Sequence, residues 1–164
     1  PSSGGWARAD IPRILGLLPP RGEVGETLAL IREKVSDAQT RGEVLFMDQR
    51  QLLTFGYIPD VPLVAEYEKK YLMDQAMGET AASTFPGFYR DLENRRFALI
   101  ISDPLHLPIK DSDYRFGEEN NAWVKWVAAP ILCYYEPLVT LEEFKIQLLI
   151  PLESISPDCV MPLP

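Results

Sequence analysis

Three residues with reactive side chains follow two apolar segments of the chain. Asp48 comes directly after the apolar run 44–47. Asp103 lies two residues after the run 97–101, and His106 is close behind it. If both runs are strands that end at one edge of a sheet, these side chains could bind a sugar or a phosphorylated ligand, hold a metal ion or form an acid–base pair. The alternative is structural, because aspartates also end strands by stabilising turns and capping helices.

Most other kinds of active site lack their residues in this sequence. The chain has one histidine and two cysteines, whereas a zinc site needs several such ligands at close spacing. No glycine-rich turn follows the run 44–47, as a nucleotide site would require. No serine has the glycine-flanked setting of a hydrolase nucleophile. We therefore predict no catalytic residue, no metal and no cofactor, and ligand binding at Asp48, Asp103 and His106.

The charge of the chain limits its partners. With 24 acidic and 16 basic side chains the net charge is -8, which opposes binding to phosphate backbones, so we expect no nucleic-acid partner. The longest apolar stretch, near residues 127–135, is too short to span a bilayer. The sequence begins with Pro1 and carries no leader peptide, so we expect a segment taken from a longer protein.

The apolar pattern predicts a single α/β domain over residues 1–164, with an irregular lead-in at 1–20 and a tail at 151–164. The runs 44–47 and 97–101 lack alternation, which is typical of parallel strands buried on both faces. The residues between them have helical spacing and are long enough for a crossover. We therefore predict a small three-layer Rossmann-like open sheet that is mostly parallel.

The C-terminal third is expected to extend this sheet. We predict a helix over 118–127 and strands over 131–135 and 144–150. An antiparallel C-terminal edge of the sheet is compatible with this pattern. Trp123 and Trp126 lie on the predicted helix. We expect their side chains to pack in the core or at an interface rather than to stack on a sugar ring. Cys133 and Cys159 leave two alternatives open, one disulfide or two free thiols.

Residues 42–138 resemble the soluble C-terminal domain of bacterial polytopic membrane glycosyltransferases, the relatives of protein mannosyltransferases and aminoarabinose transferases. The resemblance is carried by Gly-Glu-Val-Leu-Phe-Met-Asp at 42–48, Tyr-Leu-Met-Asp at 71–74, Arg-Phe-Ala-Leu-Ile-Ile at 96–101 and Tyr-Glu-Pro at 135–137. Met73 stands where this family has an aromatic residue.

The resemblance implies a function for the parent protein. The family transfers sugar from a polyprenyl-phosphate carrier on the extracytoplasmic side of the cell membrane, and its catalytic carboxylates lie in an early loop of the membrane domain. The chain would then be an accessory domain that works with the transmembrane part of its own parent chain. Two alternatives stay open: a stand-alone module that binds a sugar or phosphorylated ligand without catalysis, and a hydrolase that uses Asp48, Asp103 and His106.

Overall fold

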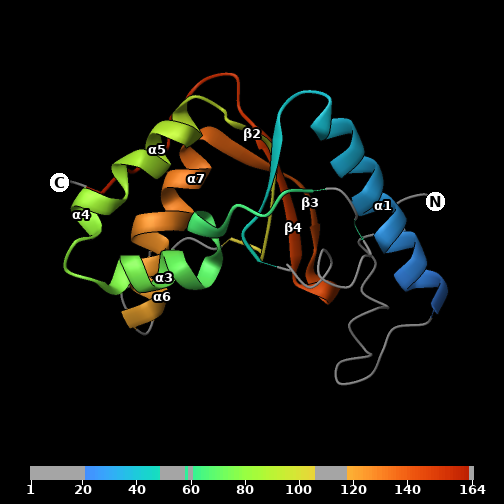
Figure 1. Ribbon diagram of the computed structural model, residues 1–164, viewed down its shortest axis with the longest axis horizontal. Helices are drawn as coiled ribbons and strands as arrows, with labels where there is room; N and C mark the ends of the chain where they lie inside the picture. The colour runs from blue at the N-terminus through green and yellow to red at the C-terminus, as the bar shows by residue number, and fades with distance from the viewer. Residues whose placement is uncertain (1–20, 49–57, 59–60, 106–117, 163–164) are drawn as a thin grey trace.

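A four-stranded sheet lies between helices on both of its faces (Figure 1). The computed structural model describes residues 21–48, 58, 61–105 and 118–162. The strands, in the order β1-β2-β4-β3 across the sheet, are β1 (Glu43–Phe46), β2 (Phe97–Ser102), β3 (Tyr135–Leu141) and β4 (Ile146–Pro151).

The pairing of β1 with β2 is parallel, as the two apolar runs predict. Leu45 lies opposite Ile100 and Phe46 opposite Ile101, and the amide of Met47 extends the ladder by donating to the carbonyl of Ile101 at 2.9 Å. Every residue of β2 is buried. Burial on both faces explains why neither run alternates between apolar and polar residues.

The prediction of a mostly parallel, Rossmann-like sheet is wrong. β4 pairs antiparallel with β2 on one side and with β3 on the other, so β1 and β2 form the single parallel pair of the described sheet. For the pair β3–β4 the cause is the short connection between them, a 3-10 turn at η5 (Glu142–Phe144) closed by Lys145 at φ 57°. A connection this short can join only antiparallel neighbours.

The strand predicted at 131–135 is wrong as well. A continuous helical run passes from α6 (Glu118–Trp123) through a π-helical segment, η4 (Val124–Ala128), into α7 (Ala129–Tyr134). β3 begins only at Tyr135. The helix is buried on most sides at Pro130, Ile131, Cys133 and Tyr134, and a short run that is apolar all round does not distinguish a helix from a strand.

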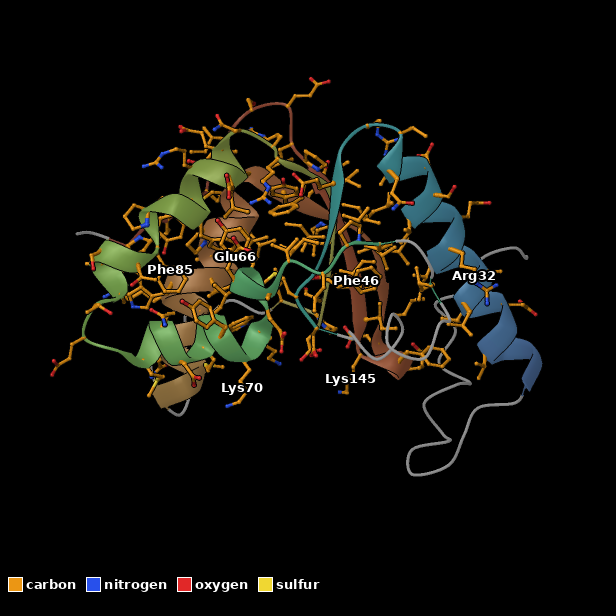
Figure 2. The ribbon with its side chains drawn as sticks, in the orientation of Figure 1. Arg32, Phe46, Glu66, Lys70, Phe85 and Lys145 are labelled. Carbon is orange, nitrogen blue, oxygen red and sulfur yellow. A yellow bond between two sulfur atoms is a disulfide. The ribbon has the colours of Figure 1, made fainter. Side chains whose placement is uncertain are left out.

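Two apolar clusters hold the helical layers to the sheet. α1 (Arg21–Gln39) packs through Ile31 and Val35 on the face that carries Val44 and Phe46. The other face is covered by η3 (Ala65–Tyr67), α3 (Lys69–Met77), α4 (Ala81–Thr84), α5 (Pro86–Glu93) and α7. Figure 2 shows Phe46 at the sheet and Phe85 within that second layer. Successive side chains of β1 thus point into opposite apolar clusters, because the side chains of a strand alternate between its two faces.

Tyr135 joins the last helix to the sheet at the point where the helix becomes a strand. Its side chain is almost fully buried, and its hydroxyl donates to the carbonyl of Phe97, the first residue of β2, at 2.7 Å. Burial raises the pKa of Tyr135 from 10.0 to about 12. The neutral hydroxyl therefore stabilises the fold below pH 10, and this contribution is lost as the pH rises towards 12.

We predict that Tyr135→Phe lowers the free energy of unfolding by about 1–2 kcal/mol near neutral pH, because it leaves the buried carbonyl of Phe97 without its donor. Urea unfolding measures the change. Tyr71→Phe is the matched control, since Tyr71 is half exposed on α3 and should lose almost nothing. Equal effects of the two substitutions would contradict the role of this hydrogen bond.

Candidate functional site

The candidate site lies at the carboxyl edge of the parallel pair. Asp48 follows β1 and Asp103 follows β2, and because the two strands run in the same direction both residues reach the same edge. Both carboxylates meet the ammonium group of Lys69, the first residue of α3. Its Nζ lies 3.7 Å from Oδ2 of Asp48 and donates a hydrogen bond to Oδ2 of Asp103.

Lys69 is held in place by its own backbone and by a ring. Its amide donates to the carbonyl of Met47 at 2.7 Å, which fixes the first turn of α3 over the end of β1. Its ammonium group also lies 5.7 Å from the centre of the Trp123 ring, within the range of a cation–π contact. The three charged side chains are each about one-third exposed, so solvent weakens their attraction.

A hollow of about 450 Å³ opens beside this ion bridge. Its walls include Met47, Asp48, Lys69, Met73 and Asp74, with Glu68 and Lys70 completing the lining. The lining residues carry three carboxylates and two ammonium groups, which is a surplus of one negative charge. Such a lining suits a ligand rich in hydroxyl groups, which can donate to carboxylates and accept from ammonium groups, better than it suits a phosphate.

The outcome for the three predicted site residues is mixed. The structure brings Asp48 and Asp103 together on Lys69, whereas His106 lies outside the described residues. The hydrolase hypothesis uses Asp48, Asp103 and His106 together, so the described residues do not test it. Within the described ranges, no cluster of three or more His, Cys, Asp or Glu residues could hold a metal ion.

Lys69 is a site residue that we did not predict from the sequence. Its signal was present in the topology, because the chain after a parallel strand leaves from the carboxyl edge of the sheet, where a helix of the crossover can begin. A lysine in the first turn of that helix is therefore close to an aspartate that ends the strand. Its neighbour Lys70 points away from the body of the protein in Figure 2 and pairs loosely with Asp74 at 3.9 Å.

A second polar cluster lies at the opposite end of the same two strands and is structural. Arg96 pairs with Glu43 at 3.0 Å and with Asp91 at 2.9 Å, and Tyr67 donates to Asp91 at 2.6 Å. Burial, and next the hydrogen bond to Asp91, raise the pKa of Tyr67 well above its usual value. The hydrogen bond that Arg96 donates to Glu43 is the main cause that raises the pKa of Arg96. The four side chains satisfy one another's hydrogen-bonding groups and connect β1 to the start of β2.

Comparison with known proteins identifies no relative of this chain. No protein-family model, no curated protein and no solved structure matches the chain.

The ion bridge leads to a stability prediction. Lys69→Met should lower the free energy of unfolding by about 1 kcal/mol, because two adjacent carboxylates lose their shared cation. The loss should shrink at high salt, which screens partly exposed charges. Urea unfolding at low and high salt measures both effects.

Lys70→Met is the control for that substitution, since the Lys70–Asp74 pair is largely exposed and should contribute almost nothing. If the two variants lose the same stability, or if the loss in Lys69→Met does not depend on salt, the bridge does not bind the two strand ends together.

Proposed function

We propose that this chain is the extracytoplasmic accessory domain of a membrane glycosyltransferase. In this proposal the parent protein takes its sugar from a polyprenyl-phosphate donor, and the catalytic residues lie outside the chain. The domain would sit over the active site of the transmembrane part of its own parent chain and contribute to recognition of the substrate.

The segments that carry the resemblance support this proposal by their places in the fold. Residues 42–48 contain β1 and end at Asp48, and residues 96–101 contain most of β2. Residues 135–137 open β3. The motifs at 42–48 and 96–101 therefore lie in the two strands whose ends form the candidate site, and the motif at 71–74 lies in α3, which lines its hollow.

The observation that carries the proposal is a disulfide between Cys133 and Cys159. It joins the buried side of α7 to the segment that follows β4. Disulfides of this structural kind persist in oxidising compartments and are rare where thiols are kept reduced. An oxidising environment is what a domain on the extracytoplasmic side of a membrane would meet.

The hollow beside Lys69 supports the same class of ligand. Its mixed carboxylate and ammonium lining suits sugar hydroxyls, and its surplus negative charge disfavours direct contact with a phosphate. A domain that recognises the sugar here would leave the phosphate carrier to another part of the parent protein. None of the helices within the described ranges combines the length and the apolar composition that crossing a bilayer requires.

A stand-alone sugar-binding module is the second candidate. The hollow of about 450 Å³ at the carboxyl edge favours it, since α/β sheets commonly bind ligands there. The two candidates differ in what the parent protein does. The accessory domain fractionates with membranes and is needed for transfer of a sugar, whereas the module remains in the soluble fraction and needs no membrane partner.

The test is the sidedness of the parent protein in intact cells. Ser36→Cys places a thiol on the exposed face of α1, on the opposite side of the sheet from α7. We predict that a membrane-impermeant maleimide labels this variant without permeabilisation. We also predict that Cys133 and Cys159 of the parent protein without the variant are labelled only after reduction.

Two results would count against the accessory-domain proposal. Labelling of Ser36→Cys only after permeabilisation would put the domain on the cytoplasmic side. Recovery of the whole parent protein in the soluble fraction would favour the stand-alone module instead. Permeabilised cells are the control, because there the added thiol must react in either case.

A further inference from the structure

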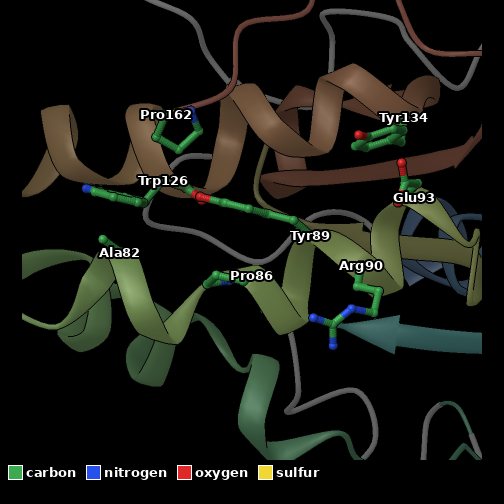
Figure 3. A pocket seen from close by; sticks show the side chains of 8 residues that line it. All are labelled: Ala82, Pro86, Tyr89, Arg90, Glu93, Trp126, Tyr134 and Pro162. Carbon is green, nitrogen blue, oxygen red and sulfur yellow. The ribbon is translucent and has the colours of Figure 1, made fainter. Parts of the chain in front are cut away.

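A second hollow lies in the helical layer, away from the Asp48 site. It has a volume of about 320 Å³ and opens between α4–α5 and η4–α7. Figure 3 shows Tyr89 and Trp126 lying along it between the two helical walls, with Pro162 of the C-terminal segment beside them. Pro86, Arg90, Glu93 and Tyr134 also line it, and it shares no lining residue with the first hollow.

The position of Tyr89 is fixed by a defect in the opposite helix. In a regular α-helix the carbonyl of Trp126 accepts from the amide of residue 130, but Pro130 has no amide hydrogen. The hydroxyl of Tyr89 donates to this carbonyl instead, at 2.7 Å. Trp126 itself lies in the π-helical segment that precedes Pro130, and such segments are frequent at functional sites.

The aromatic wall is rigid. The ring of Phe85, which is fully buried, stacks with Tyr89 at 5.7 Å and with Trp126 at 5.6 Å between ring centres, both at 23° between planes. Tyr89 and Trp126 are only partly buried and pack against the core. The two rings therefore offer a preformed aromatic surface, which reduces the entropy lost when a ligand binds.

The disulfide fixes the third wall of this hollow. Cys159 is joined to Cys133 of α7, and the amides of Leu152 and Ser156 donate to the carbonyls of Tyr134 and Cys133, each at 2.8 Å. These bonds hold the segment that ends with Pro162 against the helix. The wall therefore belongs to the folded domain.

Two charged side chains accompany the rings. Arg90 and Glu93 are exposed and lie on successive turns of α5. In the part of the chain that the structure describes, neither side chain has a hydrogen bond or an ion pair. They supply several donors and a pair of acceptor oxygens next to the aromatic surface.

We propose that this aromatic cleft binds one sugar ring of a saccharide. The C–H face of a pyranose packs on aromatic rings by dispersion and burial of apolar area, while its hydroxyls need both donors and acceptors, which Arg90 and Glu93 provide. A volume of about 320 Å³ accommodates one ring. This site goes beyond the proposed function, because it requires neither a membrane partner nor the Asp48 edge.

Titration of the chain by two-dimensional NMR tests the proposal. The probes are methyl α-mannopyranoside, methyl β-glucopyranoside and N-acetylglucosamine, each observed through the indole N–H signals. We expect at least one of them to shift the Trp126 signal saturably. Arg90→Ala combined with Glu93→Gln should weaken this binding about tenfold or more, since charged hydrogen bonds to the hydroxyls are lost.

The matched control is Arg32→Ala combined with Glu33→Gln, which makes the same charge changes on the exposed face of α1 and should leave binding unchanged. Absence of a saturable shift with all three sugars would overturn the proposal, as would equal weakening by the two double variants. A proline-rich peptide that binds the cleft where no sugar does would overturn it in favour of peptide recognition.

Discussion

The parallel pairing of β1 with β2 is the constraint on which the rest of the structure depends. Two strands that run in the same direction cannot be joined by a tight turn, so the chain must cross over through helices. Here the crossover is the layer from η3 to α5, which covers one face of the sheet, while α1 covers the other. Both strands are therefore buried on both faces, although β1 lies at the edge of the sheet and pairs only with β2.

The same constraint separates two sets of charges with different roles. At the amino ends of the two strands, Glu43, Asp91 and Arg96 satisfy one another and clamp the sheet. At the carboxyl ends, Asp48 and Asp103 share Lys69 beside an open hollow. The first set is closed and structural. The second faces a space that a ligand can enter, as is common at the carboxyl edge of α/β sheets.

A second set of contacts attaches the C-terminal segment to the helices around Tyr134. Arg95, two residues after the end of α5, adopts the left-handed conformation at φ 53°, which is unfavourable for a residue with a side chain. Its guanidinium group compensates by lying 5.0 Å from the centre of the Tyr134 ring and by donating to the carbonyl of Leu152. These contacts, together with the disulfide, join α5, α7 and the segment after β4 around the aromatic cleft.

The sequence predicted the central parallel pair of strands correctly but misplaced the elements of the C-terminal third. The apolar runs at 44–47 and 97–101 revealed two parallel neighbours, because burial on both faces has a sequence signature. The hairpin between β3 and β4 was missed since Lys145, rather than a glycine, takes the left-handed position in its turn. The helix at Ala129–Tyr134 was missed because it is apolar on most sides. The pairing of Cys133 with Cys159 and the approach of Lys69 to both aspartates depend on tertiary contacts, which spacing alone does not specify.

The direction of the β1–β2 pairing can be measured directly from cross-strand nuclear Overhauser effects in the isotopically labelled chain. We expect contacts between backbone amides and α-protons of Leu45 and its partners around Ile100, in the staggered pattern of parallel strands. We also expect close α-proton pairs between β2 and β4 near Ile101 and Leu148. Close α-proton pairs between β1 and β2, or no contact between these strands, would contradict the account, because Asp48 and Asp103 would then no longer meet at one edge.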